Sequence, residues 1–171
     1  ISARSNKSDT CDHFYITKYM SETKCGERTT QSAIFPLFTY SVALGKTTRT
    51  PNLKPEIVAE ISGKLNLPFV PESNGGVTES FAPIDLLDYI YAVLHSPKYR
   101  ETYKEFLKID FPRVPYPTDK KMFWKMVELG GEIRKLHLME SSLFDTLITT
   151  YPVTGTNEVV KLNRKDNRVY I

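Results

Sequence analysis

The sequence lacks the motifs of the common enzyme classes. It contains no glycine-rich phosphate-binding loop, no Cys-x-x-Cys pair and no His-Glu-x-x-His helix. A Gly-x-Ser-x-Gly nucleophile elbow is also absent. General acid–base catalysis needs a base held near a nucleophile and an orienting partner, and no such set can be named here. We therefore expect a binding or scaffolding module with no catalytic residues and no turnover by itself.

Cysteine and histidine are scarce. The two cysteines, Cys11 and Cys25, cannot form a disulfide framework, which favours a reducing compartment. Together with His13 they offer three zinc ligands where a structural zinc site uses four, so we predict no metal site. His95 and His137 lie near the C-terminal ends of expected helices. There the His95 imidazole can cap terminal carbonyl groups, and a positive charge on His137 would interact favourably with the helix dipole. We interpret all three histidines as structural.

Long hydrophobic runs are missing as well. No segment resembles a signal peptide or a membrane-spanning helix, so we expect a cytoplasmic protein with no membrane partner. Hydrophobic residues make up 40% of the 171-residue chain and aromatic residues 12%, which is typical of a globular protein. The net charge of +3 permits contact with a polyanion without requiring it.

Four helices are expected in the centre of the chain. Proline is favoured at the first helical position and serine at the cap, which predicts helices over 55–65, 83–95 and from Ser96-Pro97 to about 107. Thr118 or Asp119 caps a longer helix that reaches about residue 140. Helical spacing predicts these core-facing side chains: Ile57, Val58, Ile61, Leu65, Leu87, Ile90, Tyr91, Leu94, Tyr99, Tyr103, Phe106, Leu107, Met122, Met126, Leu129, Ile133 and Leu136.

Residues 110–117 are expected to form a stiff, extended connector before the longest helix. Pro112, Pro115 and Pro117 each remove a backbone donor and restrict the preceding residue. Arg113 lies between two of these prolines. We expect its side chain to form an ion pair with the body of the domain.

Two features inside the helices carry specific expectations. Gly130 and Gly131 each cost about 1 kcal/mol relative to alanine in a helix, which indicates that another backbone passes close by. Asp85 lies near a helix N-terminus, where a negative charge is favourable. Asp88, three residues later, is expected on a solvated face. Neither carboxylate requires a catalytic explanation.

Short strands are expected at both ends of the chain, over 13–19, 33–40, 146–151, 158–162 and 168–171. Because Pro36 has no backbone N–H to donate, we expect the strand over 33–40 to lie at a sheet edge or to contain a bulge. A polar turn around Asp166 and Asn167 is expected to join the strands over 158–162 and 168–171. The chain stops inside the last strand, which we interpret as a boundary of a fragment.

The predicted fold class is α+β, with short β-strands at both ends around a helical centre and a long helix after a Pro-rich connector. We treat 1–171 as one truncated domain: 1–117 a recognition-type α+β region, 118–140 a long joining helix, and 141–171 the start of a C-terminal strand region.

The segment from Asp88 to Pro117, DYIYAVLHSPKYRETYKEFLKIDFPRVPYP, has a distinctive pattern of aromatic residues and prolines. It closely resembles the C-terminal specificity (target-recognition) region of type IIG and type ISP single-chain restriction-modification enzymes, which carry an adenine-specific DNA methyltransferase. The resemblance continues through 123–140. Segments 22–27, 34–37, 148–153 and 168–171 support it, so nearly the whole chain is covered.

The resemblance implies a DNA-reading role for activities located elsewhere in a parent chain. In such enzymes a nuclease, and sometimes a helicase, precedes the methyltransferase, and the last region reads the DNA. This chain has no Asn/Asp-Pro-Pro-Tyr/Phe methyltransferase motif and no glycine motif for S-adenosylmethionine. We therefore expect no cofactor in this fragment, and S-adenosylmethionine and Mg²⁺ in the parent, with ATP as a further candidate. The expected partners are double-stranded DNA and the methyltransferase domain of the same chain. The alternative is a packing module that braces the methyltransferase without reading bases.

A DNA reader needs basic side chains for phosphates and Arg, Lys, Asn, Gln, Ser or Thr for base edges. The polar loop before the second expected strand offers both, and Gln31 can pair with adenine and Arg28 with guanine. A hydrated loop without DNA contacts is the alternative. The predicted DNA-binding residues are Arg4, Asn6, Lys7, Lys24, Arg28, Thr29, Thr30 and Gln31, with Lys46, Arg49, Lys161, Arg164, Lys165 and Arg168 as second-rank phosphate contacts.

Overall fold

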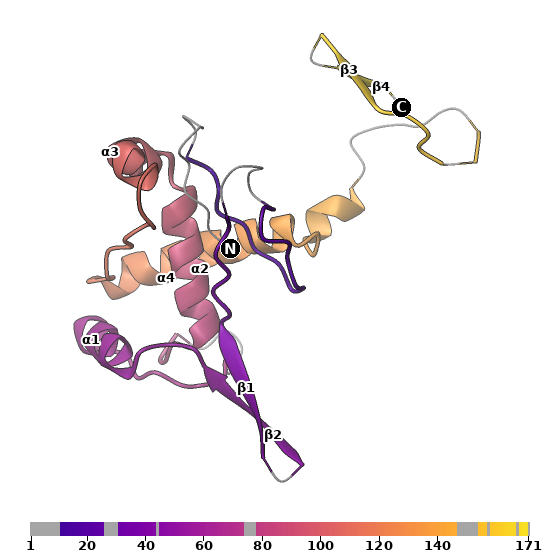
Figure 1. Ribbon diagram of the computed structural model, residues 1–171. Coiled ribbons are helices and arrows are strands. Elements are labelled where there is room, and N and C mark those ends of the chain that lie inside the picture. Colours follow the sequence, from indigo (N-terminus) through magenta and orange to yellow (C-terminus); the bar gives the residue numbers. More distant parts are fainter. Residues whose placement is uncertain are drawn as a thin grey trace. The chain divides into compact units, whose positions relative to one another are not determined.

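The computed structural model describes residues 11–25, 31–43, 45–73, 78–146, 154–156, 158–166 and 168–170 (Figure 1). They belong to two compact units, Ile1–Ser141 and Ser142–Ile171. The first holds the antiparallel hairpin β1 (Phe38–Ala43) and β2 (Lys46–Pro51), then helices α1 (Pro55–Leu65), α2 (Pro83–His95), α3 (Pro97–Leu107) and α4 (Lys120–His137). The second holds the 3-10 turn η1 (Ser142–Asp145) and the hairpin β3 (Asn163–Lys165) and β4 (Arg168–Tyr170). The predicted α+β class is confirmed.

The helices begin where local signals predict, and only the end of α4, at His137, falls short of the predicted limit of about residue 140. Proline occupies the first turn of α1, α2 and α3. The Ser96 hydroxyl accepts the backbone N–H of Tyr99 at 3.4 Å, and the Asp119 carboxylate accepts that of Met122 at 2.6 Å. Each bond satisfies one of the N–H groups that a helix start leaves unpaired. Asp119, rather than Thr118, is therefore the cap of α4.

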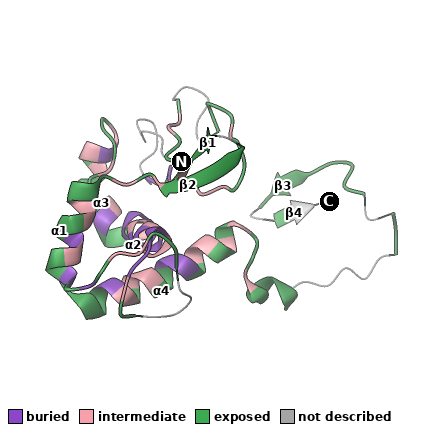
Figure 2. Ribbon diagram, turned by 90° about the horizontal axis from the view of Figure 1, so that it is seen from below, coloured by how far each residue is buried: buried purple, intermediate pink, exposed green. Residues whose placement is uncertain are grey.

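Helix α2 is the centre of the first unit. Its buried side chains include Leu86, Tyr89 and Val93, and they belong to one apolar cluster with residues of α1, α3 and α4 (Figure 2). Phe81 before α2 and Phe123 of α4 are both completely buried, and their rings meet edge to face with centroids 5.9 Å apart. Burial of this area and the favourable ring geometry stabilise the contact between α4 and the segment that leads into α2.

A very close backbone contact joins α2 and α4 at the glycine pair. A Cβ added to Gly130 would lie 1.9 Å from the carbonyl oxygen of Asp88, and one added to Gly131 would lie 3.1 Å from Asp88 Oδ2. The expected close approach of a second backbone is confirmed. The expectation for Asp88 was wrong: its residue is only 5% exposed, and its carboxylate accepts two bonds from the Arg134 guanidinium, at 2.6 and 3.0 Å. Its partner lies 46 residues away, beyond the reach of local sequence patterns.

The connector between α3 and α4 has no regular secondary structure, as expected, and two tyrosines hold it in place. The Tyr89 hydroxyl donates to the Pro115 carbonyl at 3.0 Å, and the Tyr99 hydroxyl donates to the Arg113 carbonyl at 2.9 Å. The predicted ion pair between Arg113 and the body was wrong. Its side chain is 81% exposed, and its guanidinium lies 3.7 Å from the carboxylate of nearby Asp110.

The face that α4 buries also differs from the predicted stripe. Met122 and Leu129 are 58% and 44% exposed, whereas the fully buried positions are Phe123, Gly130 and Gly131. Small residues on a helix face allow a close backbone contact that a count of large apolar side chains does not detect. In α3, Tyr103 is likewise exposed, at 46%, and not in the core as predicted.

The strand predictions were less accurate than the helix predictions. Residues 13–19 and 158–162 form no strand, and the strand expected over 33–40 begins only at Phe38. Before it, the side chain of Asn52 donates to the Pro36 carbonyl at 2.9 Å. The C-terminal hairpin is present, but Asn163–Lys165 pairs with Arg168–Tyr170. Of the segment 146–151, residues 147–151 lie outside the described residues.

His95 and His137 meet Tyr91 between the C-terminal ends of α2 and α4. The His95 Nδ1–H donates to the Tyr91 carbonyl at 3.0 Å, which confirms that this imidazole caps a helix carbonyl. The Tyr91 hydroxyl and His137 Nδ1 are hydrogen-bonded at 2.7 Å, and the two imidazole centroids are 5.2 Å apart. Burial, together with the nearby positive charge of Arg100, lowers the pKa of His95 below its ordinary value of 6.5, and burial raises the pKa of Tyr91 to about 12.

We expect acid to destabilise the first unit through His95. Because the folded-state pKa is lowered, the unfolded chain binds a proton first, so stability is full above about pH 6.5 and falls as the pH drops toward the folded-state value. The maximum slope for one group is about 1.4 kcal/mol per pH unit. Urea unfolding at pH 7.5 and 5.5 should show a smaller loss in His95→Gln than in the wild type. An equal loss in both would assign the effect to other groups.

Candidate nucleic-acid interface

The β1–β2 hairpin is the most exposed regular element of the first unit. Every described residue from Thr39 to Ala43 and from Lys46 to Thr50 is solvent-exposed. Gly45 lies in the connecting turn with a φ of 74°, a conformation that glycine adopts without strain. In Figure 1 the hairpin extends away from the helices of its unit. An isolated two-stranded hairpin is only marginally stable in water, so a protein that displays one needs to hold it at its base.

The base of the hairpin is held by Arg49 and Asn52. The Arg49 guanidinium forms a bidentate ion pair with the Glu72 carboxylate, and its Cζ lies 4.2 Å from the centroid of the Phe38 ring. The backbone N–H of Asn52 donates to the Leu37 carbonyl at 2.9 Å. Arg49 is therefore committed to a carboxylate in this structure and is a weaker phosphate candidate than the sequence indicated.

The register of the hairpin separates its side chains into two faces. Tyr40 lies opposite Arg49, and Val42 lies opposite Thr47. We call the other side the hydroxyl face because Thr39, Ser41, Thr48 and Thr50 provide four hydroxyl groups there. Ala43 and Lys46 complete the hydroxyl face at the tip. On this face Thr39 lies opposite Thr50, Ser41 lies opposite Thr48, and Ala43 lies opposite Lys46.

A sequence signal for this region was missed. The chain has 20 acidic residues, yet none lies between Glu27 and Glu56, whereas Arg28, Lys46, Arg49 and Lys54 lie within that interval. A long acid-free stretch that is rich in Thr and Ser avoids repulsion with phosphates and supplies hydrogen-bonding groups for base edges. This pattern could have drawn attention to the hairpin before the structure was known.

The first predicted DNA-binding loop is described only in part. Lys24 and Gln31 are both exposed, and the segments that carry them lie close together because the Ser32 N–H donates to the Thr23 carbonyl at 2.7 Å. Hydrogen bonds with the hydroxyl groups of Ser21 and Ser32 lower the pKa of the exposed Cys25 thiol. The other predicted members, Arg4, Asn6, Lys7, Arg28, Thr29 and Thr30, lie outside the described residues.

The second basic set lies in the C-terminal unit. Lys161, Arg164, Lys165 and Arg168 are all exposed. Lys165 and Arg168 are directly opposite each other across the β3–β4 hairpin. Two like charges in this position repel each other, and an anion between them would relieve the repulsion. The two predicted basic sets therefore occupy separate units of the chain.

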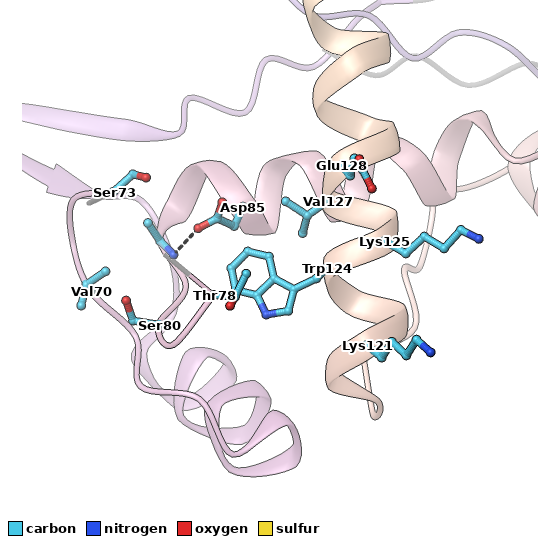
Figure 3. Close-up of a pocket in the computed structure, with 11 residues that line it drawn as sticks. Val70, Ser73, Thr78, Ser80, Asp85, Lys121, Trp124, Lys125, Val127 and Glu128 are labelled. Carbon is cyan, nitrogen blue, oxygen red and sulfur yellow. Dashed lines mark hydrogen bonds between the residues drawn. The ribbon is translucent and has the colours of Figure 1, made fainter. Parts of the chain in front are cut away.

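A cavity of about 630 Å³ lies beside α4 and the start of α2 (Figure 3). Trp124 reaches from α4 toward the segment that carries Thr78 and Ser80. Asp85 accepts the Ala82 N–H at 2.8 Å, as expected near a helix N-terminus, and burial raises the pKa of this carboxyl. The lining also carries hydroxyl groups and lysines, but no hydrogen bond between two described lining side chains joins an acid, a base and a nucleophile, so we assign the cavity no catalytic role.

Within the described ranges, no three His, Cys, Asp or Glu side chains gather where they could hold a metal ion. Cys11 is buried and donates to the Lys104 carbonyl at 3.6 Å, and burial raises its pKa, whereas Cys25 is exposed. Among the described helices, none has both the length and the apolar composition needed to cross a membrane.

Comparison with protein families identifies the chain. The model of the type ISP C-terminal specificity domain matches residues 1–171. The chain belongs to this family. Searches of curated proteins and of solved structures gave no match. The family match confirms the type ISP part of the resemblance and gives the chain a specificity role in restriction-modification. Domains of this kind are typically non-catalytic, in agreement with the absence of enzyme motifs from the sequence.

Proposed function

We propose that this type ISP specificity domain recognises a short sequence in double-stranded DNA and thereby positions a methyltransferase and a nuclease located elsewhere in a parent chain. The observation that carries the proposal is the family match over residues 1–171. The parent is proposed to be an adenine-specific methyltransferase that uses S-adenosylmethionine, with Mg²⁺ for cleavage and ATP as a further candidate. No residue of this chain is assigned to those cofactors.

The surface chemistry of the first unit supports DNA as the ligand. The stretch between Glu27 and Glu56 contains no acidic residue, and its exposed β1–β2 hairpin carries both hydroxyl groups and positive charge. Lys24 and Gln31 lie on the neighbouring loop in sequence, and a glutamine side chain can pair with adenine through two hydrogen bonds. We propose this loop, with Arg4, Asn6, Lys7, Arg28, Thr29 and Thr30, as one contact region.

The C-terminal unit supports a second contact region for the phosphate backbone. Lys161, Arg164, Lys165 and Arg168 provide positive charge without an intervening carboxylate except Asp166. Phosphate contacts of this kind set the position and strength of binding but do not discriminate between sequences.

Selection from a pool of random duplexes, followed by sequencing of the bound DNA, tests the proposal. We expect the 171-residue chain to enrich one short motif. Lys165→Ala should weaken binding to all duplexes alike and reduce the slope of log K against log salt by about 1. Gln31→Ala should relax the preference at one base pair, at a cost of about 1–3 kcal/mol. Lys98→Ala, which removes an exposed charge from α3, is the matched control and should change neither quantity.

A folded chain that enriches no motif and binds all duplexes weakly would contradict the proposal. It would favour the alternative of a packing module that braces the methyltransferase. Circular dichroism of the same preparation shows whether the chain is folded.

A further inference from the structure

We infer that the β1–β2 hairpin is the base-reading element, and that it enters the DNA major groove with its hydroxyl face toward the base edges. The inference rests on the proposed function and deepens it, because it names the element and the groove. The observation behind it is the juxtaposition of four hydroxyl groups on one face of an exposed, acid-free hairpin.

The dimensions of the hairpin suit the major groove. That groove is about 12 Å wide and 8.5 Å deep and admits a two-stranded β-ribbon, whereas the minor groove of undistorted DNA is only about 6 Å wide. Each strand has six residues, which corresponds to about 20 Å of extended chain. Paired strands are about 4.8 Å apart, so the ribbon with short side chains fits between the groove walls.

The hydroxyl face has the chemistry of a base reader. Each Ser or Thr hydroxyl can donate and accept a hydrogen bond, so it can meet either kind of group on a base edge. The methyl groups of threonine and alanine can contact the thymine methyl group, which lies only in the major groove. The central pair, Ser41 and Thr48, lies directly across the two strands and is small enough to allow the backbone close to the bases.

The orientation follows from what each face already contacts. Arg49, on the face opposite the hydroxyl groups, is paired with Glu72 of the body. Among the described residues, no ion pair is seen for the hydroxyl face, and Lys46 at its tip is exposed. A lysine at the tip can reach a phosphate across the groove, because its stem is long and flexible. Positive charge without carboxylates favours a polyanion over an apolar partner for this face, and the proposed function makes DNA that polyanion.

Matched substitutions on the two faces of the same strand test the inference. Thr48→Val and Thr47→Val make the same change on neighbouring residues, remove one hydroxyl each, and keep the β-branched shape that strands favour. We expect Thr48→Val, combined with Ser41→Ala, to lower the ratio of specific to non-specific affinity at least about tenfold. Thr47→Val should leave this ratio within about twofold. Lys46→Ala should reduce the salt dependence of binding and leave the selected motif unchanged.

The outcomes separate this inference from the proposed function. If the wild type enriches a motif and the Thr48→Val/Ser41→Ala variant keeps the same motif and affinity ratio, DNA recognition stands and the hairpin is not the reader. If the wild type enriches none, the proposed function and the hairpin inference both fail.

A second experiment uses only the wild-type chain and so does not depend on how the variants fold. Methylation of guanine N7, which lies in the major groove, should block binding at positions within the selected motif. If only methylation of adenine N3, which lies in the minor groove, blocked binding, the inference would be overturned.

Discussion

Gly130→Ala should destabilise the first unit by about 2 kcal/mol, because the added methyl group has no space between α2 and α4. Its Cβ would lie 1.9 Å from the Asp88 carbonyl oxygen and 2.7 Å from the carbonyl carbon. These are backbone atoms, so the helices must move apart. Overpacking of this kind costs about 1–3 kcal/mol and occasionally more, and the gain in helix propensity, about 1 kcal/mol, offsets only part of it. Urea unfolding followed by circular dichroism measures the change.

Gly63 in α1 provides a matched control for this prediction. Nothing lies within 4 Å of a Cβ added there, so Gly63→Ala should increase the stability by up to about 1 kcal/mol. Gly131→Ala should fall between the two, because the nearest atom, 3.1 Å away, is a side-chain oxygen that can shift. Equal effects of the Gly63 and Gly130 substitutions would show that the tight contact does not exist in solution.

Arg134→Ala should cost about 3–5 kcal/mol, the loss typical of breaking a buried ion pair. The Asp88 side chain is 7% exposed and accepts both of its strong hydrogen bonds from this guanidinium. Without Arg134 the carboxylate stays buried and unpaired, so much of the cost is its lost solvation. The hydrogen bond to Asp88 also raises the pKa of Arg134, so the guanidinium stays charged.

An exposed ion pair in the same unit serves as the control. Lys64 and Glu60 lie one turn apart on α1, with side chains 40% and 50% exposed, and their nitrogen and oxygen are 2.6 Å apart. Glu60→Ala should therefore change the stability by about 0.5 kcal/mol or less. A similarly small effect of Arg134→Ala would mean that water reaches Asp88. The double variant Asp88→Leu/Arg134→Met should recover part of the loss, because it leaves no unpaired charge.

The helices were predicted well because their signals are local. Proline in the first turn and a serine or aspartate cap act within a few residues, and they gave the limits of α1 and α2 as the structure has them. Strands need a partner that the local pattern does not name. The aromatic run 13–19 has high strand propensity, yet it forms no strand.

Contacts between distant residues explain the remaining errors in the fold. Asp88 looks like a surface residue until Arg134 is placed beside it. Met122 and Leu129 look like core residues until the glycines show which face of α4 meets α2. Periodicity reports the hydrophobicity of a face, and it does not report how closely two backbones approach.

The candidate site was predicted less completely than the fold. The sequence prediction was based on individual Arg and Gln side chains and therefore chose the segment 24–31. Most of that segment lies outside the described residues. The hairpin received only Lys46 and Arg49 as secondary candidates. A residue-by-residue search gives little weight to threonine and serine, whereas their shared face becomes visible only when the register of β1 and β2 is known.

The glycine contact between α2 and α4 also determines when the unit can fold during synthesis. Asp88 and Arg134 are separated by 46 residues, and a ribosome adds about 5–20 residues per second, so Arg134 follows Asp88 by about 2–9 seconds. Throughout this interval Tyr89 and Ala92, which α4 will cover, have no native partner on that side of α2. A nascent chain with an uncovered apolar helix face is prone to aggregation. We therefore expect the unit to reach its protease-resistant state only after α4 has left the ribosomal tunnel.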